Sequence, residues 1–150
     1  MTPTTIMTKE DFRGLGAPDL VYVREIWGPT AAQLRYEGRR DLGNVEPGDG
    51  KRFLGRGLIQ VTGRDNYKAA TRALRAVESR APDFEQDPVA LEQPPWAALS
   101  AAWFWQSNGL NELADKDQFT TITRRINGGL NGLEDRLQLW ARAKAAFCVS

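Results

Sequence analysis

The stretch KRFLGRGLIQVTGRDNY, residues 51–67, begins with alternating apolar residues and then changes to a helical pattern. Residues 53–62 alternate and are interrupted by Gly55 and Gly57, which predicts a small β-hairpin rather than a buried strand. From Asp65 the apolar residues take helical spacing, and one face of the predicted helix holds Tyr67, Ala70, Leu74 and Val77.

Polar side chains are concentrated in the same stretch. Gln60 and Thr62 would point to one face of a strand, and Asn66 follows shortly after them. Amides both donate and accept hydrogen bonds, as sugar hydroxyl groups require. Two interpretations stay open at this point: a carbohydrate-binding face, or the water-exposed face of an ordinary hairpin. The first carboxylate of the stretch is Asp65, so acid–base chemistry would need residues from elsewhere.

The remaining pattern is mostly helical. A short helix is predicted within residues 28–38, with Thr30 and Gln33 forming a capping box. Residues 43–52 are predicted to be a loop. Three later helices are predicted. The first begins after Pro94-Pro95, the second runs from about residue 118 to Gly128-Gly129, and the third begins after a cap at Asn131. The apolar stripes of the first and last of these helices are Trp96, Leu99, Trp103 and Leu133, Leu137, Trp140, Phe147.

About five helices and one small hairpin predict a mainly α (α+β) fold. We expect an irregular segment over residues 1–20 and one domain over 21–150, since 150 residues suffice for one compact core.

Composition excludes several function classes. The net charge of +1 argues against a dedicated nucleic-acid binder. The chain has no histidine and one cysteine, Cys148, so His/Cys metal sites and His-dependent nucleophilic catalysis are excluded. Acid–base chemistry must fall to Asp, Glu, Lys or Tyr. No apolar run approaches the ~18 residues of a membrane span, so no membrane insertion is expected.

Three longer segments resemble glycoside hydrolase family 19, closest to its phage and bacterial endolysin-like branch. They are YEGRRDLGNVEPGDGKRFLGRGLIQVTGRDNY, SAAWFWQSNGLNELAD and ITRRINGGLNGLEDR, and the resemblance covers roughly residues 20–147. It implies a lysozyme-like fold with the hairpin at the cleft. It also implies hydrolysis, with inversion, of β-1,4-linked N-acetylhexosamine polymers, either peptidoglycan or chitin. It implies no cofactor and no metal.

The resemblance also implies roles for individual residues. Glu25, in YVREIWGPT, would be the general base, and Thr62 would help to hold the attacking water. Arg136 would help to organise the carboxylates, since a neighbouring arginine keeps a carboxylate ionised. The expected substrate-binding residues are Gln60, Asn66, Tyr67, Asn127, Arg136 and Trp27.

One position departs from the family pattern. The general-acid glutamate should lie nine residues before Glu25, where this chain has Gly16. Three interpretations stay open. The chain is a truncated or wrongly started product, or a variant that binds a glycan or a partner without cleaving, or it uses a substitute acid: Glu10, Asp11 or Asp19.

The first residues lack the charged-then-apolar layout of a signal peptide. We therefore expect synthesis in the cytoplasm and action on the cell wall after release. The oligomeric state is not predicted.

Overall fold

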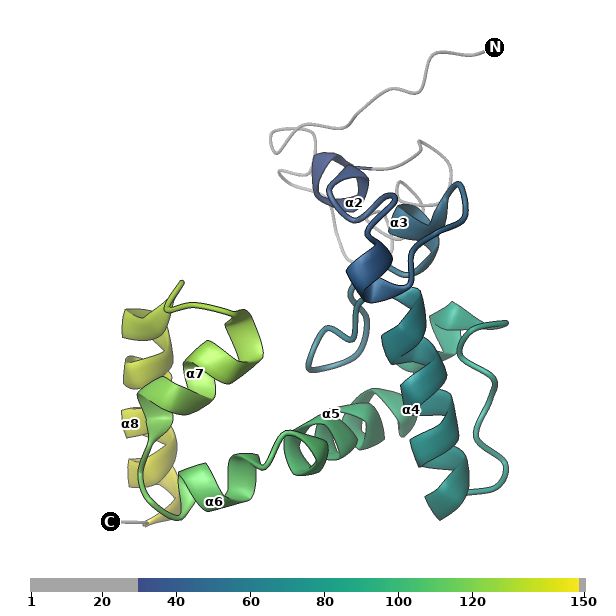
Figure 1. Ribbon diagram of the computed structural model, residues 1–150. Helices are drawn as coiled ribbons and strands as arrows, with labels where there is room; N and C mark the ends of the chain where they lie inside the picture. The colour runs from purple at the N-terminus through teal and green to yellow at the C-terminus, as the bar shows by residue number, and fades with distance from the viewer. Residues whose placement is uncertain (1–29, 149–150) are drawn as a thin grey trace, which may run out of the picture. The chain divides into compact units, whose positions relative to one another are not determined.

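The computed structural model describes residues 30–148, which are helical and contain no β-strand (Figure 1). The mainly α prediction is confirmed, and the helices are consistent with a lysozyme-like fold. The chain divides after Trp103 into two compact units, which are described separately below. Residues 1–20, predicted to be irregular, lie outside the described residues, and the domain boundary at residue 21 stays a prediction.

The first unit opens with α2 (Ala31–Leu34), which begins at the predicted capping box. The Gln33 amide donates to Thr30 Oγ1 at 3.2 Å, and the Thr30 amide donates to Gln33 Oε1 at 2.8 Å. Two orphan backbone donors are thereby satisfied reciprocally, as the sequence pattern predicts. A single 3₁₀ turn, η2 (Arg40–Leu42), follows.

The segment predicted to be a loop contains one helical turn, α3 (Asp49–Arg52). Glu37 fixes this turn, because its carboxylate accepts hydrogen bonds from the amides of Gly48 at 2.6 Å and Gly50 at 2.8 Å. Gly50 is required there, since a Cβ would lie 2.4 Å from the Gln33 carbonyl oxygen. The loop prediction was therefore wrong for residues 49–52. The helical turn forms there because Glu37, distant in sequence, binds its backbone amides, although the local sequence has little helix propensity.

The predicted hairpin is not confirmed as a pair of strands. Residues 53–63 form a loop closed by one antiparallel bridge between Arg56 and Val61. Their amides and carbonyls exchange hydrogen bonds of 3.1 and 2.9 Å. Gly57 and Gln60 have left-handed backbone angles, with φ of 73° and 60°, so the chain reverses at once and no further ladder forms. We call residues 53–63 the polar loop.

The core of the first unit forms around α4 (Arg64–Val77). Tyr67, Ala70 and Leu74 are buried as predicted, whereas Val77 is 84% exposed because α4 ends there. The core is completed by η3 (Pro88–Glu92) and by α5 (Trp96–Ser107), whose predicted stripe packs against it. The buried residues of this core are Phe53, Val61, Tyr67, Ala70, Leu74, Ala81, Phe84, Ala90 and Leu91.

The second unit comprises α6 (Leu110–Ala114), α7 (Phe119–Asn127) and α8 (Leu133–Phe147). Leu110 and Ile122 are buried, and they form the small apolar centre of this unit. The α7 helix ends at Gly128, whose φ of 70° gives the predicted left-handed cap. The N-cap of α8 is Gly132 and not the predicted Asn131.

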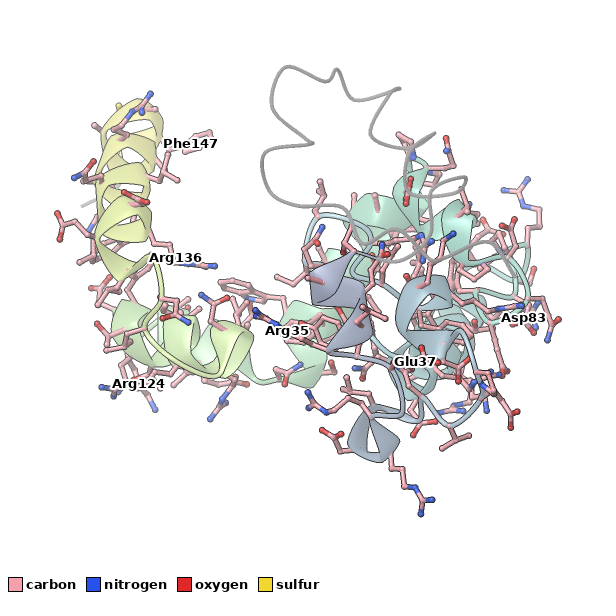
Figure 2. The ribbon with its side chains drawn as sticks, turned by 90° about the horizontal axis from the view of Figure 1, so that it is seen from above. Arg35, Glu37, Asp83, Arg124, Arg136 and Phe147 are labelled. Carbon is pink, nitrogen blue, oxygen red and sulfur yellow. The ribbon has the colours of Figure 1, made fainter. Side chains whose placement is uncertain are left out.

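The predicted core stripe of α8 is only half-buried. Leu133, Leu137 and Trp140 are intermediate in exposure, and Phe147 is 77% exposed. Figure 2 shows Arg136 near one end of α8 and Phe147 near the other. Over residues 30–148, no helix is both long enough and apolar enough to cross a bilayer. The same residues contain no group of three or more acidic, histidine or cysteine side chains arranged to hold a metal ion.

Candidate functional site

The structure joins three of the predicted site residues on and beside the polar loop. Thr62 Oγ1 donates to the Gln60 carbonyl at 2.8 Å, and Asn66 Nδ2 donates to the Thr62 carbonyl at 2.7 Å. Gln60 and Asn66 are exposed, and Thr62 is half-buried. Their side chains lie close together although the segment is not a strand. We call Gln60, Thr62 and Asn66 the amide–hydroxyl cluster.

Gly55 lies against this cluster. A Cβ at Gly55 would lie 2.7 Å from Gln60 Oε1 and 3.1 Å from Thr62 Oγ1. Both side chains therefore extend across the same backbone position, and a side chain at residue 55 would displace them. Glycine at position 55 therefore makes room for the cluster. The sequence pattern alone did not show that this position must lack a side chain.

Tyr67 lies beneath the polar loop and is fully buried. Its hydroxyl donates to the Leu54 carbonyl at 2.6 Å and accepts from Arg56 Nη1 at 2.9 Å. A side chain placed in this way contacts no solvent, so any effect of Tyr67 on a substrate would pass through the loop that it holds. Its predicted role in substrate binding stays a prediction, and its packing role is observed.

Arg56 fastens the polar loop to the rest of the first unit. Its Nε atom pairs with Glu92 Oε1 at 3.0 Å, and its Nη1 atom also donates to the Arg52 carbonyl at 2.7 Å. Arg56 is 9% exposed, so these charge-assisted bonds are largely removed from water. The loop backbone is also close-packed at Gly57, since a Cβ there would lie 3.0 Å from Ser100 Oγ. The amide–hydroxyl cluster thus stands on a fixed backbone.

A second ionic network fixes the start of α4, where Asn66 is located. Arg64 binds Asp49 with two hydrogen bonds of 2.6 and 3.0 Å, and it pairs with Glu85 at 2.8 Å. Burial raises the pKa of Asp49, but the hydrogen bond from Arg64, two backbone hydrogen bonds and the arginine charge outweigh it, so this pKa lies below its ordinary value. The same bonds hold the pKa of Arg64 above its ordinary value. Sequence reasoning missed this network, because nothing local connects residues 49, 64 and 85.

The other predicted residues lie in the second unit or outside the described residues. In the second unit, Arg136 Nη2 donates to Asn127 Oδ1 at 3.2 Å, and Asn127 Nδ2 donates to the Asn131 carbonyl at 3.0 Å. Arg136 and Asn127 are therefore brought together, as one arginine–amide pair. Glu25, the predicted general base, and Trp27 lie outside the described residues.

A fixed loop with neutral donors and acceptors, on a mainly α fold consistent with lysozymes, fits the class of the glycoside hydrolases. No family model matches the chain. It is, however, 39% identical over 105 residues to a glycosyl hydrolase family 19 domain-containing protein of Haemophilus influenzae. Two endochitinases of Arabidopsis thaliana are 39% and 38% identical to it over 80 residues. The chain is a relative of the glycoside hydrolase family 19 proteins.

These similarities cover only part of each relative. The match to the Haemophilus influenzae protein includes 70% of this chain and 48% of that protein. The matches to the plant endochitinases include 53% of this chain and 26% of each of those proteins. The chain thus spans about half the length of the bacterial relative and about a quarter of the plant relatives.

Proposed function

We propose that this chain is a glycosidase that cleaves β-1,4-linked N-acetylhexosamine polymers of the cell wall with inversion. The observation that carries the proposal is the identity of 39% over 105 residues with a family 19 protein. The amide–hydroxyl cluster supports it, because the two exposed amides of Gln60 and Asn66 can hydrogen-bond to sugar hydroxyls beside the Thr62 hydroxyl. We extend the proposal to an endolysin-type role, in which the chain reaches bacterial peptidoglycan after release from the cell.

In the proposed reaction Glu25 is the general base. Ionised Glu25 takes a proton from a water molecule, and this water attacks the anomeric carbon from the face opposite the leaving oxygen. Thr62 holds that water. Gln60, Asn66 and Asn127 bind the sugar, and Trp27 offers an apolar ring face to it.

The general acid is not assigned to a residue, because Gly16 stands at the family's general-acid position. Protonation of the leaving oxygen then falls to a substitute carboxyl group or to water. Since general acid–base catalysis contributes about 10²–10⁴-fold to a rate, we expect a reduced turnover with substrate binding retained.

The test is clearance of purified bacterial cell walls and of colloidal chitin, followed as a loss of turbidity. Wild type is compared with Glu25→Gln and with the control Glu46→Gln, which changes an exposed carboxylate without a side-chain partner in the described structure. We expect Glu25→Gln to abolish clearance and Glu46→Gln to leave it unchanged. Proton NMR of the first product should show the α-anomer, and a β-anomer would refute inversion. Preference for walls over chitin would favour peptidoglycan as the substrate.

A second candidate is a catalytically silent glycan- or partner-binding protein on the same scaffold. Gly16 favours it, because a variant without its acid can keep an intact binding loop. Walls that co-sediment with wild type and with Glu25→Gln, without any clearance, would support this candidate against the enzyme. Failure of both activities would reject both candidates for this chain.

A further inference from the structure

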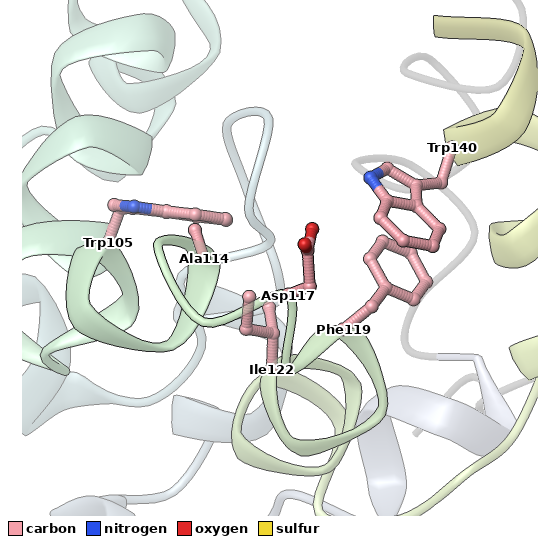
Figure 3. A pocket seen from close by; sticks show the side chains of 6 residues that line it. All are labelled: Trp105, Ala114, Asp117, Phe119, Ile122 and Trp140. Carbon is pink, nitrogen blue, oxygen red and sulfur yellow. The ribbon is translucent and has the colours of Figure 1, made fainter. Parts of the chain in front are cut away.

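The second unit contains a pocket of about 140 Å³ that none of the proposed catalytic or substrate-binding residues lines. Its wall is formed by residues of α5, α6 and α7, of the segment between α6 and α7, and of α8. The lining side chains are those of Trp105, Ala114, Asp117, Phe119, Ile122 and Trp140 (Figure 3). All but one of them are apolar or aromatic.

The aromatic walls of the pocket are held by contacts of their own. Trp105 Nε1 donates to Asn111 Oδ1 at 2.8 Å, which fixes the orientation of the indole. Phe119 and Trp140 stack with their centroids 4.9 Å apart and their planes 14° apart. Ile122, which is 6% exposed, anchors the pocket to the apolar centre of the unit. The walls are therefore in place without a ligand.

Asp117 is the single charged residue in this lining. Its carboxylate points into the space between Trp105 and the Phe119–Trp140 pair (Figure 3). Within residues 30–148 this carboxylate has no hydrogen bond or ion pair. Its backbone has a φ of 52°, a left-handed conformation that Asp and Asn adopt more readily than other side-chain-bearing residues. The fold thus places an unpaired negative charge at an aromatic pocket.

The size and polarity of the pocket restrict its ligand. A volume of about 140 Å³ is close to that of a cavity that binds benzene, so the pocket accommodates about six heavy atoms. An N-acetylhexosamine ring is larger and presents several hydroxyls, for which one carboxylate is too few partners. A short aliphatic chain ending in an ammonium group fits better. Its methylenes would lie on Trp105 and Ile122, and its charge would meet Asp117 and the aromatic rings.

One contact on the outside of the pocket shows the same chemistry. Lys144 Nζ lies 4.8 Å from the centroid of the Trp140 ring. The Trp140 ring therefore already contacts an ammonium group, from its own helix. Within residues 30–148 the Lys144 ammonium forms no ion pair with Asp117, so the carboxylate remains available for a second cation.

We propose that this pocket binds a primary alkylammonium group, and that its source is the side-chain amine of a diamino acid in the peptide part of the cell wall. A glucosamine amine is the less suitable source, because it sits on a polar ring that the apolar walls would desolvate. The choice of source rests on the proposed function, whereas binding of the alkylammonium does not.

Binding is tested on the ¹⁵N-labelled protein with n-butylammonium as the probe and 1-butanol as its neutral counterpart. The indole N–H signals of Trp105 and Trp140 report on the pocket. We expect both signals to shift with n-butylammonium. The affinity for 1-butanol should be lower by about fivefold, because one partly exposed ion pair contributes about that factor to binding. Equal affinities for the two probes would overturn the proposal.

Asp117→Asn is the decisive variant, because asparagine accepts the left-handed backbone and lacks the charge. It should lose the preference for n-butylammonium while its spectrum stays folded. Asp115→Asn, which changes a neighbouring exposed carboxylate outside the pocket lining, should keep it. A preference that survives in Asp117→Asn, or disappears in Asp115→Asn, contradicts the assignment of Asp117.

The source is tested by acetylating the amines of purified cell walls. Acetylation should raise the KM of wild type for walls and leave that of Asp117→Asn unchanged, with chitin hydrolysis equal in both proteins. An unchanged wild-type KM would exclude the diamino acid as the source. If walls are not cleared at all, the proposed function fails, but the result with n-butylammonium still decides whether the pocket binds a cation.

Discussion

Replacement of Tyr67 by phenylalanine separates the packing role of this residue from a role in substrate contact. The variant keeps the buried ring, which meets Phe53 edge-on with centroids 5.2 Å apart. It removes a hydroxyl that donates to the Leu54 carbonyl at 2.6 Å and accepts from Arg56 at 2.9 Å. A neutral hydrogen bond contributes about 1 kcal/mol and one to a charged group about 1.5–3 kcal/mol. We therefore expect a loss of about 2–4 kcal/mol in the free energy of unfolding.

The measurement is urea denaturation followed by tryptophan fluorescence, with Tyr36→Phe as the matched control. Tyr36 is half-buried, and its hydroxyl has no hydrogen bond in the described structure, so its loss should change stability by less than about 0.5 kcal/mol. Wall clearance by Tyr67→Phe is assayed well below its midpoint of unfolding. If Tyr67→Phe is as stable as Tyr36→Phe but binds glycan more weakly, the packing argument is wrong and Tyr67 contacts the substrate directly.

Two further predictions concern the residues around the polar loop. Gly55→Ala should lower the free energy of unfolding by less than about 1 kcal/mol, because the Gln60 side chain can rotate away, but it should raise the KM for glycan. Gly129→Ala, where a Cβ meets nothing within 4 Å, is the stability control. An unchanged KM in Gly55→Ala would refute the close approach of Gln60 and Thr62 to residue 55. Asp49→Asn should cost about 3 kcal/mol at neutral pH, since it breaks a largely buried ion pair with Arg64. The pKa of Asp49 is lowered in the folded state, so its contribution is full above its ordinary value of 3.8 and is lost as the pH falls through the lower folded value. Thermal unfolding of both proteins should therefore converge below about pH 3.8, and a constant difference down to pH 2 would contradict the argument.

The sequence predicted the helices wherever a local signal was sufficient. The Thr30–Gln33 capping box and the left-handed cap at Gly128 depend on nearest neighbours, and both are present. The hairpin was harder to predict, because alternation indicates a face but does not fix the number of paired residues. Left-handed angles at Gly57 and Gln60 shorten it to a single bridge.

Features that depend on residues distant in sequence were not predicted. The turn at α3 is held by Glu37, and the start of α4 is held by Asp49 and Glu85 through Arg64. Nothing in spacing or composition pairs these residues. For the same reason the sequence assigned Trp140 to a core stripe, whereas Trp140 lines a pocket together with Trp105 and Asp117.

The amide–hydroxyl cluster and the missing acid affect different steps of the proposed reaction. In the proposed reaction, hydrogen bonds from Gln60 and Asn66 would act on the bound sugar, so they would contribute to KM as well as to the transition state. A general acid acts only while the leaving oxygen gains its proton, and its loss lowers kcat by about 10²–10⁴-fold with little change in KM. A chain with a fixed polar loop and Gly16 should therefore bind glycan normally and turn it over slowly. A leaving group that needs no proton, such as 2,4-dinitrophenolate on a chitooligosaccharide, should then restore most of the lost rate. If such a substrate is cleaved no faster than the natural polymer, acid catalysis is already supplied by another carboxyl group, and Glu10, Asp11 and Asp19 become the residues to replace.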